Sequence, residues 1–162
     1  MNKEVCNVNN VLFVCHGNIC RSPMAEFLFR DMVEKRGLGD KILVASAGTS
    51  AEEMGNPPHP KTQKKLRDNG IIVKGKQARQ LTREDYDRYD YILGMDEYNI
   101  RNMRRLFRED PDNKVYRLLD LTNSTRDIAD PWYTGDYDQA YEDIYEGCIA
   151  LLDKILKELM QG

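Results

Sequence analysis

The chain has 162 residues and a formal net charge of −3, with 41% hydrophobic and 31% charged residues. This composition is typical of a single globular domain, predicted to span residues 1–162, and the acidic balance argues against general binding to nucleic acid or acidic membranes. No apolar run reaches the length of a membrane span and no signal-peptide core follows Met1, so we expect a cytoplasmic protein. The four cysteines match neither a disulfide scaffold nor a zinc site, and we expect no metal and no cofactor.

The first predicted elements are a strand, a tight loop and a helix. A strand is predicted at 10–15, where four consecutive apolar residues precede Cys15, and the chain then turns at the Gly-Asn pair 17–18. Ser22 and the proline after it are typical of an N-cap followed by the first helical residue, and Gly37 is expected to end the helix. A second apolar strand is predicted at 42–45. Strand, helix and strand with short connections predict a parallel βαβ unit.

Helices and strands alternate along the rest of the chain, without repeats, linkers or low-complexity segments. This alternation predicts a doubly wound α/β sandwich around a mostly parallel sheet of about four strands. In such folds ligands bind beyond the carboxyl ends of the strands, and Cys15 lies at one of these ends. The remaining elements are predicted as a basic helix at 60–69, a short apolar run at 71–73, a brief helix opened by a capping pattern at 82–85, a strand at 91–95, a helix capped by Asp96, a strand at 115–118 and a closing helix at 138–160.

Cys15 and Arg21 lie at the two ends of the loop that follows the first strand. Unsatisfied N–H groups at a helix N-terminus, together with loop amides, favour an anion, and a guanidinium matches two oxygens of a phosphate. The same field would stabilise the thiolate form of Cys15. The Cys-x5-Arg spacing alone is a weak signal, but here it stands between an apolar strand and a helix start. The loop is therefore predicted to hold a phosphoryl group and to attack it.

A thiolate that attacks a phosphate ester needs a general acid to protonate the leaving group. Asp130 is the candidate, because Pro131 restricts its backbone to an extended conformation and a long irregular loop is expected there. Trp132 and Tyr133 follow directly and would suit an aromatic phosphoester. The competing interpretation is an ordinary Asp-Pro turn with a packed tryptophan.

The order of these motifs resembles that of the low-molecular-weight protein tyrosine phosphatases over essentially the whole chain. The resemblance rests on the loop 15–22, Ser46 after the second strand, the segment 78–82, the strand and turn at 91–96, and Asp130 with its proline. It implies a flavodoxin-like α/β fold with a central, mostly parallel four-stranded sheet. It also implies metal-free hydrolysis of phosphotyrosine and small aryl phosphates through a cysteinyl-phosphate.

The resemblance implies a role for each residue of the predicted site. Cys15 would be the nucleophile and Arg21 the phosphate clamp. Asp130 would be the acid of the first step and the base that activates water in the second. The substrate would also contact the loop and the aromatic pair, namely His16, Gly17, Asn18, Ile19, Cys20, Ser22, Trp132 and Tyr133.

A further group of residues would support the loop. Ser22 would donate a hydrogen bond to the Cys15 sulfur, and Asn18 would hold the loop in shape by contacting Ser46. A hydroxyl donor stabilises a thiolate, and asparagine tolerates the unusual backbone angles of a tight loop. Asp96 is expected to lie behind the site as well.

The chain departs from the family's pattern at two places. Many members carry an aromatic residue where this chain has Ala-Glu-Glu at 51–53, which puts one wall of the ring pocket in doubt. Eukaryotic members usually place a histidine where Lys76 or Gln77 stands here. In the family, a cysteine at the position of Cys20 can form a reversible disulfide with the nucleophile, and a plain packing role is the alternative. His16 is expected at a solvated rim, with tuning of the nucleophile as the alternative.

Two other functions remain open from the sequence. A related group reduces arsenate with the same loop, but it needs further cysteines near 91–96, and Cys6 and Cys148 are poorly placed substitutes. A non-catalytic phosphopeptide-binding module would need neither a thiol nor a general acid. The expected partners are phosphotyrosine proteins and, by resemblance, an opposing tyrosine kinase, with the protein acting as a monomer. The arginine run 101–108 is interpreted as a solvated helix face, and no nucleic-acid or membrane partner is expected.

Overall fold

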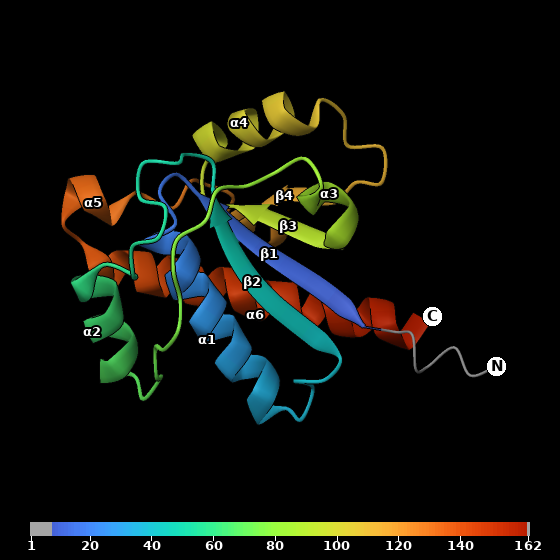
Figure 1. Ribbon diagram of the computed structural model, residues 1–162. Coiled ribbons are helices and arrows are strands. Elements are labelled where there is room, and N and C mark those ends of the chain that lie inside the picture. The colour runs from blue at the N-terminus through green and yellow to red at the C-terminus, as the bar shows by residue number, and fades with distance from the viewer. Residues whose placement is uncertain (1–7, 162) are drawn as a thin grey trace.

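The protein is described by a computed structural model that covers residues 8–161 (Figure 1). Within that range no helix is long and apolar enough to cross a membrane. The elements in chain order are β1 (Asn9–Cys15), α1 (Arg21–Lys35), β2 (Ile42–Gly48), α2 (Pro60–Asp68), α3 (Asp85–Arg88), β3 (Tyr91–Gly94), α4 (Glu97–Phe107), β4 (Val115–Arg117), the 3-10 turn η2 (Leu118–Leu121), α5 (Pro131–Thr134) and α6 (Tyr137–Gln161).

The four strands form one parallel sheet in the order β2-β1-β3-β4. Helices α1 and α6 cover one face and α4 covers the other, so the predicted doubly wound α/β sandwich is confirmed (Figure 1). Cys15 at the end of β1 is in register with Gly48 of β2, and Val14 is in register with Gly94 of β3. The carboxyl ends of the three strands therefore meet at one edge of the sheet, where the site lies.

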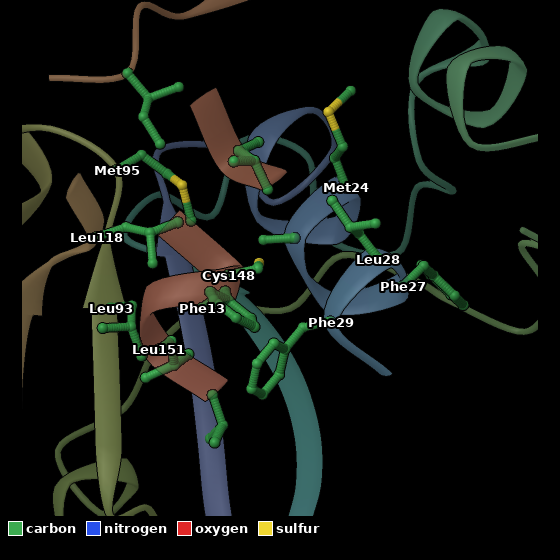
Figure 2. Packing of buried hydrophobic residues seen from close by; sticks show 14 of the residues in the cluster. Phe13, Met24, Phe27, Leu28, Phe29, Leu93, Met95, Leu118, Cys148 and Leu151 are labelled. Carbon is green, nitrogen blue, oxygen red and sulfur yellow. The ribbon is translucent and has the colours of Figure 1, made fainter. Parts of the chain in front are cut away.

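Alternate residues of β1 bury their side chains on opposite faces of the sheet. Phe13 packs in the layer of α1 and α6, with its ring edge-on to Phe29 at a centroid distance of 5.6 Å. Leu12 lies in the smaller layer under α4. Cys148 packs beside Phe13 as the small apolar side chain that the sequence predicts for it (Figure 2). Each fully buried aromatic or aliphatic side chain contributes roughly 1.5–3 kcal/mol, and this two-sided burial fixes the strand that carries the site.

The start of α1 differs from the prediction. The helix begins at Arg21, with Cys20 as its N-cap and no side-chain cap hydrogen bond. The prediction of Ser22 as the N-cap is therefore wrong. The physical reason is that the Ser22 hydroxyl lies 3.0 Å from the Cys15 sulfur, so it is engaged across the loop and does not cap the helix.

The other differences are smaller. The apolar run 71–73 does not form a strand, because left-handed turns at Gly70 and Gly75 bracket it and Ile72 points outward with 78% of its surface exposed. Strand β2 is longer than predicted and contains Ser46. The loop predicted around Asp130 holds the short helix α5, whose Pro131 occupies the first helical position.

Candidate active site

The loop between β1 and α1 is held against the end of β2 by backbone contacts. The amide of Thr49 donates to the carbonyl of Cys15 at 2.9 Å, and the amide of Ser50 donates to the carbonyl of His16 at 2.9 Å. A Cβ atom on Gly48 would lie 2.7 Å from the His16 carbonyl oxygen, so only glycine permits this approach. Asn18 adopts a left-handed conformation with φ of 61°. The loop is thus clamped in one shape.

Cys15 lies buried at the base of this loop. Its sulfur is 3.0 Å from the Ser22 hydroxyl and accepts a hydrogen bond from the Ser22 amide at 3.4 Å. Asn18 Nδ2 donates to the same hydroxyl oxygen at 2.8 Å, and Asn18 Oδ1 accepts from the Arg79 amide at 3.0 Å, which fixes the orientation of the Asn18 amide. Because the Ser22 oxygen already accepts a hydrogen bond, its own proton is directed at the sulfur. The predicted contact from Ser22 to Cys15 is present.

A buried polar chain extends from Asn18 into the protein. Asn18 Nδ2 donates to Ser46 Oγ at 2.9 Å, as predicted, and Ser46 Oγ donates to Glu26 Oε1 at 2.5 Å. The buried Glu26 carboxylate also accepts from Arg30 Nη2 at 2.6 Å and lies 3.5 Å from Lys76 Nζ. The loop therefore rests on a network of charged and neutral hydrogen bonds, in which a buried polar group without its partner would be costly.

Lys76, which is distant in sequence from the loop, also belongs to this network. Its ammonium group donates to the Ser46 carbonyl at 2.9 Å. Burial lowers the pKa of Lys76, and the neighbouring Glu26 carboxylate opposes that shift. Where the resemblance leaves Lys76 and Gln77 as alternatives, the structure places Lys76 in the network and leaves Gln77 exposed.

Arg21 is 2% exposed and is tied down on one side of its guanidinium. Nη1 donates to Asp96 Oδ2 at 2.6 Å and to the Ile128 carbonyl at 2.8 Å, and Nη2 lies 3.4 Å from Asp130 Oδ2. Burial opposes the charge of Arg21, but Cys15, Asp96 and Asp130 outweigh it and raise its pKa. Among the described residues, buried Nε has no hydrogen-bond partner. The edge formed by Nε and Nη2 is therefore the one left to bind two oxygens of an anion.

Asp130 is held at the start of α5, where its Oδ1 accepts a hydrogen bond from the Trp132 amide at 3.0 Å. Its backbone is extended, as its position before Pro131 predicts. The side chains of Trp132 and Tyr133 are 56% and 82% exposed, so the competing interpretation of a packed tryptophan is wrong. The exposed rings stand beside the carboxyl group at the mouth of the site.

A cavity of about 110 Å³ brings the predicted residues together. Glu52 and Glu53, which lie where the sequence leaves one wall of the ring pocket in doubt, line this cavity as well. His16 is partly exposed at the rim, with Nε2 3.8 Å from Glu52 Oε1. The residues predicted to line the cavity that do so are Cys15, His16, Gly17, Ile19, Cys20, Asp130, Trp132 and Tyr133.

The side chains of Asn18 and Ser22 do not line this cavity. Both side chains are buried behind the loop in the hydrogen-bond network, and the prediction that these two residues contact substrate stays a prediction. Arg21 and Asp96 line an adjoining cavity of about 320 Å³ that also contains Asp130. The predicted site residues thus fall into two groups, those that line a cavity and those whose side chains lie behind the loop.

Cys20 belongs to an aromatic cluster that the sequence analysis did not identify. Its sulfur lies 3.5 Å from the Tyr137 hydroxyl, and burial raises its pKa to about 11. The His59 ring stacks on Tyr137 at 5.4 Å and meets Trp132 edge-on at 5.9 Å. Burial, with the nearby Lys61 charge, lowers the pKa of His59. This cluster supports the Trp132 side of the cavity.

Glu26 is a further residue of the site that the sequence analysis did not identify. It stands among Met24, Ala25, Phe27 and Leu28, all of which are buried. A carboxylate inside such an apolar run is buried only when it is paired, so its position in the sequence is the signal that could have identified it.

The remaining cysteines and the metal-ligating residue types form no second site within residues 8–161. No group of three or more His, Cys, Asp or Glu side chains in that range is arranged to hold a metal ion. Cys148 is buried in the core, so it is not placed to pass a disulfide outward from Cys15 as arsenate reduction would require. Cys6 lies outside the described residues.

The comparisons with known proteins agree with this geometry. The model of the low molecular weight phosphotyrosine protein phosphatase family matches residues 10–161. The chain is 46% identical over 151 residues to the low molecular weight protein-tyrosine-phosphatase YfkJ of Bacillus subtilis, covering 92% of this chain and 97% of that protein. It is 39% identical over 154 residues to the low molecular weight phosphotyrosine protein phosphatase of Gallus gallus, covering 93% and 96%.

Solved structures give the same result. The crystal structure of YfkJ from Bacillus subtilis superimposes with a TM-score of 0.91 at 45% sequence identity, covering 93% of this chain and 96% of that one. The chain therefore matches these proteins in sequence and in fold over nearly its whole length. The chain belongs to the low molecular weight phosphotyrosine protein phosphatase family.

Proposed function

We propose that the protein hydrolyses phosphotyrosine in proteins, and small aryl phosphates, with Cys15 as the nucleophile. The observation that carries this proposal is the placement of a buried, hydroxyl-bonded sulfur and a carboxyl group in one cavity, with the open edge of a guanidinium beside it. A binding module would require the guanidinium and the loop amides but neither the sulfur nor the carboxyl group.

In the first step the Cys15 sulfur attacks phosphorus and the bond to the phenolic oxygen breaks. Asp130 gives its proton to that oxygen, so a neutral phenol leaves and phosphate remains on the sulfur. Arg21 binds two of the phosphoryl oxygens through Nε and Nη2, and the amides of the loop bind the others. These donors are fixed before the reaction, which is the arrangement that stabilises a transition state most effectively.

In the second step a water molecule attacks phosphorus and the phosphorus–sulfur bond breaks. Asp130, now a carboxylate, takes a proton from the water, and the thiolate is released. The Ser22 hydroxyl, which lies 3.0 Å from the sulfur, stabilises the departing thiolate. One carboxyl group therefore acts as acid in the first step and as base in the second.

The test is hydrolysis of p-nitrophenyl phosphate with EDTA present. We expect Cys15→Ser to lose at least about 10⁴-fold in kcat. We expect Asp130→Asn to lose about 10²- to 10⁴-fold, and to slow phenyl phosphate more than p-nitrophenyl phosphate, because phenolate is the poorer leaving group. Asp138→Asn is the matched control, since this exposed carboxylate on α6 lies outside the cavity.

Acid quenching with a radiolabelled substrate gives a direct second readout. Wild type should retain phosphate on the protein and Cys15→Ser should not. Turnover that persists in Cys15→Ser, or a leaving-group dependence that Asp130→Asn leaves unchanged, would refute the assigned roles. Tight peptide binding by the wild type without any turnover would support the binding-module alternative.

We further propose a redox role for Cys20, which the resemblance implies. Peroxide would oxidise the Cys15 thiolate to a sulfenic acid, and the Cys20 sulfur would displace water from it to form a disulfide. Both residues are free thiols that line the same cavity, which supports the proposal. Peroxide-inactivated protein should regain activity with dithiothreitol, and Cys20→Ser should recover less. Equal recovery by the two proteins would contradict a protective disulfide.

The oligomeric state, the compartment and the partners of the protein are also part of the proposal. We infer that it acts as a monomer in the cytoplasm on proteins phosphorylated by a tyrosine kinase. The cysteines within residues 8–161 are thiols, as expected in a reducing compartment. Size-exclusion chromatography with light scattering checks the monomer, and a mass near 18.8 kDa is expected.

A further inference from the structure

A second cavity adjoins the active site and takes no part in the mechanism above. Its volume is about 420 Å³, which is large enough for an amino-acid side chain. We call it the flanking cavity. It lies between the end of β2 and the helix α4, and its lining residues are His16, Thr49, Ser50, Gln80, Leu81, Tyr98, Asn102, Arg105 and Leu106.

The flanking cavity is separated from the nucleophile by a single side chain. His16 follows Cys15 directly and lines both the flanking cavity and the active-site cavity. Tyr98 lines both the flanking cavity and the cavity of about 320 Å³ described above, which is also lined by Asp130 and Tyr133. A ligand that fills the active-site cavity and extends beyond its rim on the His16 side therefore meets the flanking cavity next.

The chemistry of the flanking cavity favours an anion. Arg105 supplies a positive charge, and no carboxylate is among the lining residues. Within residues 8–161 Arg105 forms no salt bridge, whereas Arg79, Arg117 and Arg126 are each paired with aspartates. Its Nη1 donates only to the neutral amide oxygen of Asn102, at 3.2 Å. The charge of Arg105 is thus available to a ligand, unlike that of the paired arginines.

The hydroxyl groups of the cavity add to this preference. Ser50, just after the end of β2, supplies one hydroxyl group to the lining. Tyr98 is largely exposed at the edge of the cavity and has a further hydroxyl donor. Leu81 and Leu106 provide the apolar surface that the methylene groups of a side chain would cover.

The active-site cavity and the flanking cavity differ in charge. Glu52 and Glu53 line the active-site cavity, and Glu52 Oε1 lies 3.8 Å from Nε2 of His16, the residue that lines both cavities. An acidic residue of a substrate would be repelled by these glutamates and attracted by Arg105. The flanking cavity is therefore the part of this rim that favours an acidic side chain.

We propose that the flanking cavity is a substrate subsite that binds an acidic side chain, aspartate or glutamate, one or two residues from the phosphotyrosine. The inference rests on the phosphatase function proposed above and names its preferred substrate class. In an extended peptide the side chains alternate, and residues two positions apart lie roughly 7 Å apart on the same face. When the phosphotyrosine ring of a peptide fills the active-site cavity, the side chain of a nearby residue of that peptide is therefore placed at the flanking cavity.

The experiment compares phosphotyrosine peptides that carry Glu, Ala or Lys at each position from −2 to +2. The readout is the ratio of kcat/KM for the Glu peptide to that for the Lys peptide within each enzyme. We expect a ratio of roughly two to five at one position for the wild type, as for an exposed ion pair. The ratio should fall towards one in 0.5 M salt, because exposed charges are screened there.

Arg105→Glu should remove or invert this ratio at that same position. Arg104→Glu is the matched control, because Arg104 is exposed on the same helix and does not line the cavity. It makes the same change of net charge and should keep the ratio. A ratio that survives Arg105→Glu would overturn the proposal. An equal fall in both variants would also overturn it, because the preference would then reflect the general field of the helix.

A binding measurement separates this proposal from the phosphatase function. Fluorescence anisotropy of the same peptides with Cys15→Ser reports the preference without any turnover. If the wild type fails to hydrolyse p-nitrophenyl phosphate but the variant still prefers Glu peptides, the proposed function fails and the subsite stands. If hydrolysis is normal and no position favours Glu in either assay, the subsite fails and the function stands.

Discussion

The loop at 15–22 and the segment around α5 meet in one cavity but are built in opposite ways. The loop is buried, and its side chains are tied through Asn18 and Ser46 to a carboxylate in the core. The α5 segment leaves Trp132 and Tyr133 largely exposed. In the proposed function the loop binds the phosphoryl group, which is the same in every substrate, and the exposed rings contact the part of the substrate that varies. Rigidity is thus placed where the chemistry is constant, and adaptability where the ligand changes.

Among the variants that test this comparison of the two regions, the largest effect is expected from Arg21→Lys, which keeps the charge but removes the two-pronged contact. We expect a loss of about 10²- to 10³-fold in kcat/KM, as for the loss of one fixed donor to a transition state. Steady-state hydrolysis of p-nitrophenyl phosphate measures it. Arg30→Lys is the matched control, because Arg30 only bonds Glu26 and Val44 behind the loop. Similar losses in both variants would mean that the loop, and not the phosphate contact, is what Arg21 provides.

Ser46→Ala tests the rigid region from behind. It removes an acceptor from Asn18 and a donor to Glu26, and buried groups left unpaired cost about 1–3 kcal/mol. We expect that loss in the free energy of urea unfolding, together with a roughly tenfold fall in kcat because the loop loosens. Ser124→Ala, at an exposed serine distant from the site, is the control. A loss of stability with unchanged kcat would show that the loop keeps its shape without this support.

Cys20 gives a pH test at the boundary between the two regions. Its pKa in the folded protein is raised to about 11, against 9.0 for an ordinary thiol, with burial as the main cause. Between these values the unfolded chain loses the proton first, so the stabilisation is present below about pH 9 and is lost as the pH rises through 11. The unfolding free energy of the wild type should fall by about 2 kcal/mol more than that of Cys20→Ala across this window.

Urea unfolding at pH 8, 9, 10 and 11 measures this difference. The comparison uses the slope with pH, so the constant cost of the cavity left by the smaller side chain cancels. Parallel curves for the two proteins would show that the Cys20 thiol is not protected from solvent as the structure indicates.

The smallest effect is expected in the exposed region. Trp132→Ala removes one aromatic wall and should raise KM about two- to tenfold, with kcat within a factor of two. Thermal stability should change little, because more than half of the Trp132 side chain is exposed. Tyr145→Ala, an exposed aromatic residue on α6 outside the cavity, is the control. A large fall in kcat would show that Trp132 also positions Asp130.

Local patterns in the sequence predicted the sheet and most of the residues that line the active-site cavity. Apolar runs ending at Cys15 and near Met95, and the cap at Asp96, are determined by neighbours in sequence, and the structure has a strand, a strand and a capped helix there. The Asp96 side chain also bonds Arg21, which the cap alone does not predict. Local patterns of this kind identify a helix or strand but not the distant residues that its side chains contact.

The rest of the site depends on contacts between distant segments, and this is where prediction failed. Ser22 was expected to cap α1, but the sulfur of Cys15 competes for its hydroxyl. Glu26 and Lys76 are 50 positions apart, so their pairing was not accessible from spacing. The same holds for Cys20 and Tyr137, which are 117 positions apart. Packing, and not local preference, decides such contacts.

The bond between Asn18 and the amide of Arg79 has a consequence for how the site matures. It joins residues 61 positions apart, and it is one of the contacts that hold the loop in its left-handed turn. Contacts that close long stretches of chain form late, after local helices and turns. During refolding, helical circular dichroism should therefore recover before phosphate binding does. Phosphate binding would therefore measure completed folding. A chain that ends before residue 79 contains the nucleophile Cys15 but lacks the Arg79 amide that helps to hold the loop in shape.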